Sequence, residues 1–200
     1  MQQTNIQTVG ITGGIGSGKS LITAILATYG IPVYDTDKRA KTLYDTDTEL
    51  RAEVIRLFGE SLYATADGKL DRSLLASIIF SNPIALARIN ALVHPAVRRD
   101  FSLWREGLAQ CRVRVCAIES ALLVGGVLER MVDDVLVVVA DDDTRIRRAT
   151  RRDAVQAEAI QARIRNQMSQ AEMILSATWV IDNNDGQPIL PQIEALPFIH

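Results

Sequence analysis

Cysteine is scarce in this chain: its 200 residues include only two, Cys111 and Cys116. Their spacing matches no zinc-binding pattern, and no paired histidines accompany them. We therefore expect neither a disulfide framework nor a zinc site, and we interpret both cysteines as buried thiols in a reducing cytosol. A chain of this length can bury a sizeable core without disulfides or structural metals.

Long apolar runs and an excess of one charge are also missing. No stretch reaches the roughly 18 consecutive apolar residues of a membrane span, and the N-terminal MQQTNIQTV has no basic and apolar leader. The formal net charge of −2 gives no general attraction to nucleic acid or to an anionic membrane. We expect a cytoplasmic protein with no nucleic-acid, membrane or obligate protein partner.

Short, β-branched apolar segments recur along the chain. They cover residues 6–12, 113–118, 135–139 and 178–181, with a weaker one at 31–34. Because these segments do not alternate with polar residues, they are typical of strands buried on both faces of a parallel sheet. Helical patterns separate them, so the sequence predicts an α/β fold built from βα units.

One interval between predicted strands is much longer than a simple crossover needs. Residues 35–112 show only helical signals, among them 73–80 and 84–93, which Asn82-Pro83 and His94-Pro95 punctuate. A crossover needs about a dozen residues. We therefore expect a helical lobe inserted beside the sheet and suited to a second substrate.

The segment GGIGSGKS contains Gly13-x-x-x-x-Gly18-Lys19-Ser20, a complete P-loop pattern. A strand pattern precedes it and a helix pattern follows, which is the context in which inward-turned backbone N–H groups bind phosphate. Lys19 then reaches the β- and γ-phosphates, and the Ser20 hydroxyl takes a place on Mg²⁺. The sequence therefore predicts binding of a nucleoside triphosphate, whereas a P-loop alone does not separate a kinase from an ATPase, a switch or a motor.

Acidic residues follow two predicted strands at the edge where an open parallel sheet binds ligands. Asp35 and Asp37 come after the second strand, and Glu119 after the third. Either aspartate can cap the helix expected near Lys38, and one can cap while the other faces a substrate. Glu119 is a candidate for Mg²⁺ hydration or for helix capping.

Residues 141–153, DDDTRIRRATRRD, are rich in arginine. On a helix, Arg145, Arg148 and Arg152 share one narrow sector. A solvated charged face is one interpretation, but we favour an arginine-bearing lid. With no acids interleaved before Asp153, these arginines repel one another unless anions bind, and arginine suits the charge that develops in phosphoryl transfer.

The motifs TGGIGSGKS, YDTDKRAK, NALVHP, ALLV, RATRRD and VIDNN, taken in this order, resemble the dephospho-CoA kinase family from about Val9 to Asn184. The resemblance implies a P-loop NTPase fold with a five-stranded parallel sheet, a helical CoA-binding lobe and a lid. It divides the single domain into a core (5–34, 112–140 and 177–200), a lobe (about 35–111) and a lid (about 141–176). It implies ATP-dependent phosphorylation of the ribose 3′-hydroxyl of dephospho-CoA, with Mg²⁺ as cofactor and with ATP and dephospho-CoA as partners.

The resemblance also implies roles for individual residues. It assigns catalysis to Asp37 as general base, with Asp35 nearby, and to Lys19 and Arg148. Ser20 holds Mg²⁺, with Glu119 or Asp37 acting through water. ATP binding falls to Gly13, Gly14, Ile15, Gly16, Ser17, Gly18, Lys19, Ser20, Arg148, Arg152, Asp182 and Asn183, and substrate binding to Asp35, Asp37, His94, Glu119 and Leu122.

Two positions depart from the family's pattern. Gly125 stands where the family usually has Glu, and Met173 where it often has Lys. Two other functions stay open: a regulatory P-loop protein that switches with nucleotide, and a kinase acting on another nucleoside or a shikimate-like alcohol. The apparent lobe and arginine-rich segment argue against the first, and the order of the specific motifs argues against the second.

Overall fold

The computed structural model describes residues 6–80 and 82–199 of the chain. It divides into two compact units: a sheet unit, Met1–Asp35 with Leu108–His200, and a helical unit, Thr36–Gly107. The sheet unit therefore comes from two separate stretches of sequence, and the helical unit from the continuous stretch between them.

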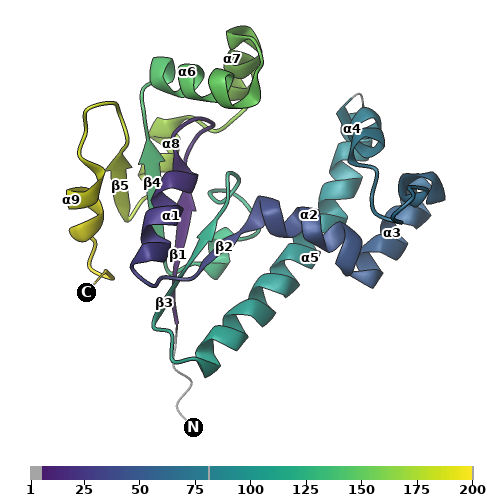
Figure 1. Cartoon of the computed structure of the whole chain (residues 1–200), viewed down its shortest axis with the longest axis horizontal. Coiled ribbons are helices and arrows are strands. Elements are labelled where there is room, and N and C mark those ends of the chain that lie inside the picture. Colours follow the sequence, from purple (N-terminus) through teal and green to yellow (C-terminus); the bar gives the residue numbers. More distant parts are fainter. Residues whose placement is uncertain (1–5, 81, 200) are drawn as a thin grey trace. The chain divides into compact units, whose positions relative to one another are not determined.

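The sheet unit contains a five-stranded, fully parallel sheet (Figure 1). The strand order is β2-β3-β1-β4-β5, so the first strand lies in the middle of the sheet. This finding confirms the predicted α/β fold and all five predicted strands. The strands are β1 (Gln7–Thr12), β2 (Val33–Asp35), β3 (Val115–Glu119), β4 (Asp134–Val139) and β5 (Trp179–Asp182).

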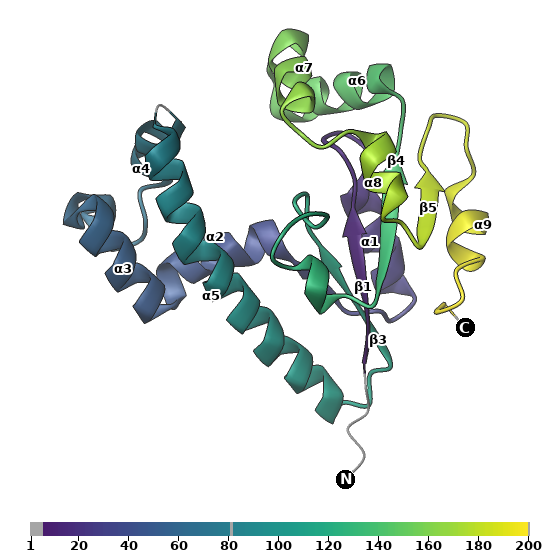
Figure 2. The ribbon, with the colours of Figure 1, turned by 180° about the vertical axis from the view of Figure 1, so that it is seen from behind.

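Helices cover both faces of this sheet. Helix α1 packs on one face and α8 on the other, as the two opposite views show (Figures 1 and 2). The α1 face holds a core that includes Ile11, Leu26, Leu136 and Ile193, all of them buried. The helices of the sheet unit are α1 (Lys19–Thr28), α6 (Asp142–Asp153), α7 (Ala157–Arg165), α8 (Gln170–Leu175) and α9 (Ile189–Glu194), with a short 3₁₀ helix at Glu129–Met131.

Apolar burial explains why β4 is a strand with no polar side. Its sequence, DVLVVV, places four successive buried residues from Val135 to Val138 on alternating sides of the sheet. Each such side chain contributes about 1.5–3 kcal/mol when fully buried. The carboxyl end of β4 leads into α6, which lies with α7 beyond that edge of the sheet (Figure 1).

The helical unit has no strand among its described residues, 36–80 and 82–107. Its elements are α2 (Thr36–Thr46), α3 (Thr48–Phe58), a 3₁₀ helix (Glu60–Tyr63), α4 (Arg72–Phe80) and α5 (Pro83–Gln110), the last of which continues into the sheet unit. Helix α3 begins at the N-cap Asp47, whose carboxylate accepts the Leu50 N–H at 2.9 Å. It ends at Gly59, which has a positive φ of 95°.

Helix α5 corrects the prediction that His94-Pro95 ends a helix. It runs without a break from Pro83 to Gln110, with Pro95 inside it. A proline within a helix removes one backbone hydrogen bond and costs about 3 kcal/mol. The buried stripe continues across the proline, from Ile89 and Val93 to Val97 and Phe101. We infer that burial of this stripe offsets the lost bond.

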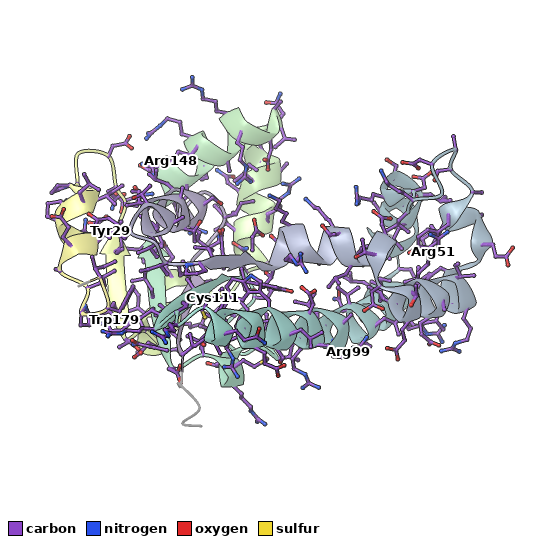
Figure 3. The ribbon with its side chains drawn as sticks, turned by 60° about the horizontal axis from the view of Figure 1, so that its bottom comes forward. Tyr29, Arg51, Arg99, Cys111, Arg148 and Trp179 are labelled. Carbon is purple, nitrogen blue, oxygen red and sulfur yellow. The ribbon has the colours of Figure 1, made fainter. Side chains whose placement is uncertain are left out.

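Ion pairs and polar contacts connect the helices of the helical unit. The Arg39 guanidinium on α2 donates two hydrogen bonds to Asp100 on α5, at 2.8 and 2.6 Å. Arg99 on α5 reaches Asp47 at 3.4 Å, and Arg51 lies 4.4 Å from the Tyr63 ring centroid. Figure 3 shows Arg99 on α5 and Arg51 on α3. The unit is thus held by polar contacts on its surface as well as by its buried stripe.

The cysteines only partly match the sequence prediction. Both are free thiols, and Cys116 is buried in β3, but Cys111 is exposed. Cys111 follows the last turn of α5, where Arg112 adopts a positive φ of 58° and the chain turns toward β3. In the described part of the chain, no helix has the length and apolar character needed to span a membrane.

Candidate phosphate-binding site

The loop from Gly13 to Gly18 joins β1 to α1 at the carboxyl edge of the sheet. Gly13, Gly16 and Gly18 have φ values of 150°, 77° and 94°, a region that L side chains rarely adopt. Gly18 is the N-cap of α1, and no side-chain hydrogen bond caps the helix there. The first N–H groups of α1 are therefore not capped by a side chain, and such a helix N-terminus favours an anion.

Lys19 lies at the first position of α1 and turns back across the loop. Its ammonium donates hydrogen bonds to the carbonyls of Gly13 at 2.9 Å and Gly14 at 3.4 Å. These bonds place a positive charge at the loop itself. The side chain therefore lies where a bound phosphate group needs a counter-charge.

Ser20, Thr23 and Glu119 form one hydrogen-bonded group. The Ser20 hydroxyl donates to Glu119 Oε1 at 3.1 Å, and the Thr23 hydroxyl donates to Glu119 Oε2 at 3.0 Å. Ser20 and Thr23 are three residues apart on α1, so they lie on one face of the helix. Both carboxylate oxygens of Glu119 therefore accept hydrogen bonds from α1, so this side chain is directed toward the helix that follows the phosphate loop.

This oxygen group suits a magnesium ion by its chemistry. Because the Ser20 hydroxyl donates its hydrogen to Glu119, its lone pairs stay available as a ligand. Mg²⁺ prefers hydroxyl, carboxylate, water and phosphate oxygens. Asp35 pairs in register with Glu119 on the neighbouring strand, so a second carboxylate comes from the same edge of the sheet. No cluster of three or more His, Cys, Asp or Glu residues suited to a metal occurs in residues 6–80 and 82–199. An ion there would need phosphate and water oxygens to complete its shell.

The two aspartates of the DTD segment fall in different units. Asp35 is the last residue of β2 in the sheet unit, whereas Asp37 lies in the first turn of α2 in the helical unit and is exposed. The helix begins at Thr36, two residues before the expected start near Lys38. A carboxylate in the first turn of a helix is favoured by the helix dipole, so the position of Asp37 fits both of the roles left open by the sequence.

The other predicted substrate residues lie on two elements. His94 is half-buried within α5 of the helical unit, and Leu122 is exposed in the loop after β3 of the sheet unit. Ser120 starts that loop, and its hydroxyl accepts the Leu122 N–H at 3.3 Å. Neither side chain belongs to the hydrogen-bonded group around Glu119.

Asn183 and Arg148, which come from separate motifs, meet beside the phosphate loop. Asn183 is buried, and its side-chain amide donates to the Ser17 carbonyl at 2.7 Å. Arg148 on α6 donates to the Asn183 carbonyl at 2.8 Å. The Asp182 carboxylate instead accepts two hydrogen bonds from Asn184. The backbone N–H of Asn184 donates at 2.9 Å and its side-chain amide donates at 2.8 Å. The residues after β5 therefore support the loop directly through Asn183, and Figure 3 shows Arg148 on α6.

The structure corrects the argument that the arginines of α6 repel one another. Arg147 and Arg148 both pair with Asp185, the latter at 2.8 Å. Arg152 pairs with Asp153 at 2.7 Å, and the hydrogen bond from Arg152 is the largest cause that lowers the pKa of this carboxyl below its ordinary value. Asp185 lies far along the sequence from α6, so inspection of residues 141–153 alone could not identify the partner.

Three contributors to the site were not predicted: Thr23, Gln167 and a specific role for Arg145. Thr23 could have been found, because it shares a helix face with Ser20. The sequence carries no signal for Gln167, whose side-chain amide oxygen accepts the Ile15 N–H at 2.9 Å, since the two residues are 152 positions apart. The helix spacing places Arg145 with the arginines expected to bind anions, but the structure buries it and has it donate to the Ile15 carbonyl at 3.0 Å.

The surroundings of Gly125 and Met173 suit the residues that this chain has at the two positions that depart from the family's pattern. Gly125 has a φ of 71°, and its N–H donates to the Glu129 carboxylate at 3.0 Å. A residue with a side chain would be strained in this conformation. Met173 is buried on α8, which begins with a capping box between Ser169 and Glu172. A lysine ammonium in that buried place would carry a desolvation cost.

Comparison with known proteins identifies the family that the chain resembles. The family model described as dephospho-CoA kinase matches residues 7–188. The dephospho-CoA kinase of Bacteroides fragilis strain YCH46 is 37% identical over 193 residues, which cover 96% of this chain and 92% of that protein. The dephospho-CoA kinase of Porphyromonas gingivalis is 40% identical over 187 residues, covering 93% of this chain and 90% of that protein.

Solved structures agree with this result. The TT1252 protein of Thermus thermophilus superposes with a TM-score of 0.80 at 35% identity, covering 94% of each chain. A dephospho-CoA kinase from Campylobacter jejuni has a TM-score of 0.65 at 24% identity, covering 90% of this chain and 89% of that one. The second likeness, at the lower identity, supports the P-loop kinase fold alone.

Proposed function

Because this chain belongs to the dephospho-CoA kinase family, we propose that it transfers the γ-phosphoryl group of ATP to the ribose 3′-hydroxyl of dephospho-CoA. The products are coenzyme A and ADP. The observation that carries the nucleotide half of this proposal is the loop from Gly13 to Gly18, with Lys19 bonded across it and Ser20 bonded to Glu119.

The residues of the sheet unit bind and orient ATP. The N–H groups of Gly16, Gly18 and the first turn of α1 donate to the phosphates, and Lys19 exchanges its loop carbonyls for phosphate oxygens. Arg148 and Arg152 form part of the ATP site on α6. Asn183 holds the Ser17 carbonyl through the hydrogen bond that its side-chain amide donates.

Ser20 would hold Mg²⁺, with Glu119 oriented by Thr23 and with Glu119 or Asp37 acting through water. When bound, the ion neutralises charge on the β- and γ-phosphate oxygens. Because Glu119 accepts the Ser20 hydroxyl hydrogen, that hydrogen points toward Glu119 and the lone pairs of the hydroxyl oxygen can face the ion.

The acceptor hydroxyl needs a group to orient it and to remove its proton. We assign this role to Asp37, with Asp35 nearby at the end of β2, because an ionised carboxylate can accept the ribose hydroxyl proton during transfer. His94, Glu119 and Leu122 complete the proposed substrate contacts. On this proposal, residues of about 35–111 form the CoA-binding lobe.

Residues of about 141–176 form the proposed lid. Its arginines lie on α6, and they pair with Asp153 at the end of that helix and with Asp185 in the loop after β5. Covering the γ-phosphoryl group excludes water, so that the bound hydroxyl reacts in preference to water. We place the enzyme in the cytoplasm, in keeping with its two free thiols.

The test is ADP formation from MgATP with and without acceptor. We expect dephospho-CoA to stimulate ADP formation strongly over the background, with coenzyme A as the second product. Dephospho-CoA lacking the 3′-hydroxyl serves as the matched control, because it can bind but offers no nucleophile at that position. Equal ADP formation in the absence of acceptor would identify an ATPase and contradict the proposal.

A further inference from the structure

The peptide groups of Ile15, at the tip of the phosphate loop, are held by side chains from a distant part of the chain. Gln167 accepts the Ile15 N–H at 2.9 Å, and Arg145 donates to the Ile15 carbonyl at 3.0 Å. Gln167 lies between α7 and α8, and Arg145 lies on α6. We propose that Arg145 and Gln167 are positioning residues that hold the phosphate loop in its nucleotide-binding conformation, an inference that rests on the proposed kinase function.

The packing around Arg145 shows that this contact is built into the loop. Arg145 is 4% exposed, and a side chain at Gly14 would collide with its guanidinium group. A side chain at Gly16 would collide with the backbone of Arg145. Glycine at these two positions therefore allows Arg145 to lie against the loop, a requirement separate from the approach of a nucleotide.

The charge of Arg145 also acts on the loop. The guanidinium donates to Asp142 at 2.7 Å, but the Asp142 side chain is 64% exposed whereas that of Arg145 is 4% exposed. Water therefore screens the carboxylate more than it screens the guanidinium. The buried positive charge beside Ile15 raises the electrostatic potential at the loop, which favours binding of polyphosphate.

Holding the peptide groups on both sides of Ile15, one by its N–H and the other by its carbonyl, reduces the number of conformations open to the unliganded loop. The N–H groups of Gly16, Gly18 and Lys19 are then oriented before the nucleotide arrives, while the Ser17 N–H donates to the Gly14 carbonyl at 3.2 Å within the loop. Such preorganisation increases affinity because less conformational freedom is lost on binding. Loss of the Gln167 acceptor should therefore weaken nucleotide binding without changing the groups that touch the reacting atoms.

A neighbouring glutamine offers a matched control. Gln170 clamps Ala140 at the end of β4, accepting its N–H at 3.0 Å and donating to its carbonyl at 2.9 Å. Like Gln167, Gln170 uses its side-chain amide to hold a backbone group, and it lies three residues further along the chain. Its two hydrogen bonds go to Ala140, not to Ile15. Gln161, exposed on α7, is a second control.

The experiment compares Gln167→Ala with Gln170→Ala and Gln161→Ala in the full chain. Hydrogen exchange of the peptide containing Ile15 is measured without nucleotide, and Mg·ADP binding by titration calorimetry. For Gln167→Ala we expect exchange on the order of tenfold faster at Ile15. We also expect an ADP dissociation constant and a KM for ATP on the order of tenfold higher, with kcat within about threefold of the original. Gln170→Ala should lower the melting temperature and leave ADP affinity unchanged.

Unchanged exchange or unchanged ADP affinity in Gln167→Ala would overturn the proposal. Equal weakening of ADP binding in Gln170→Ala would also overturn it, because the effect would then be general loosening of the segment. Arg145→Met is a secondary variant, since loss of a buried guanidinium can impair folding by itself. The exchange measurement needs no substrate, so it separates failure of this inference from failure of the proposed reaction.

Discussion

The sheet unit and the helical unit support their polar residues in different ways. In the sheet unit, Lys19, Ser20 and Asn183 are each tied to backbone or to a carboxylate of the same unit. In the helical unit, surface ion pairs such as Arg39 with Asp100 join the helices, and the proposed base Asp37 is exposed in a first helical turn. The nucleotide half of the proposed site is therefore organised within one unit. Variants in the two units should separate nucleotide binding from acceptor chemistry.

The largest effect is expected in the sheet unit, from Lys19→Ala. The variant removes the ammonium that bonds to the loop carbonyls and, on our proposal, follows the transferring phosphoryl group. Activity should fall by about 10²–10³-fold, because this charge acts in a site that excludes water. Circular dichroism should show an intact fold. Near-normal turnover would mean that the loop does not hold the reacting phosphates.

A smaller effect, confined to chemistry, is expected in the helical unit from Asp37→Asn. Asparagine caps helices about as well as aspartate but cannot accept the hydroxyl proton in the same way. We expect kcat to fall by roughly a hundredfold, with the melting temperature and the affinity for MgATP little changed. A variant with full turnover would exclude Asp37 as the base, and Asp35→Asn would then test the remaining carboxylate of this segment.

The smallest effect concerns the pH dependence of stability in the helical unit. Burial, the largest cause, raises the pKa of Tyr44 to about 12, with a further contribution from Tyr63. Between pH 10 and 12 the unfolded chain loses the Tyr44 proton that the folded protein keeps. The free energy of unfolding should therefore be undiminished below pH 10 and fall as the pH rises to 12.

Urea unfolding at a series of pH values measures this dependence. We expect Tyr44 to account for a decrease of about 1–2 kcal/mol over this range. Tyr44→Phe keeps the ring but has no proton to lose, so its stability should fall less steeply with pH. Identical slopes for both proteins would rule out Tyr44 as the source. Tyr63, whose pKa burial also raises to about 12, is the next residue to test.

Helix α5 shows where prediction from sequence failed on the fold. The dipeptide His94-Pro95 is a sound local signal for a helix end, because proline removes a hydrogen bond and restricts the residue before it. The helix nevertheless continues, since Val93, Val97 and Phe101 extend one buried stripe past the proline. Burial of this stripe in the folded chain outweighed the local preference, and that burial is not visible in the dipeptide.

The α6 arginines show a similar limit at the site. Their shared helix face followed from spacing, and their density suggested bound anions. In the structure, Arg147 and Arg148 both pair with the carboxylate of Asp185, which lies in the loop after β5. The predicted ATP contacts of Arg148 and Arg152 stay predictions, and binding must now compete with these ion pairs.

By itself the sequence determined the features that depend on local chemistry. Buried β-branched runs specified the parallel strands, and the spacing of Gly13, Gly18, Lys19 and Ser20 specified the phosphate loop. Only the tertiary structure decided which distant groups hold that loop: Asn183 on the Ser17 carbonyl, and Gln167 and Arg145 on Ile15. The physical reason is that strand and loop formation follow from neighbouring residues, whereas a hydrogen bond between residues more than a hundred positions apart depends on how the whole sheet unit packs.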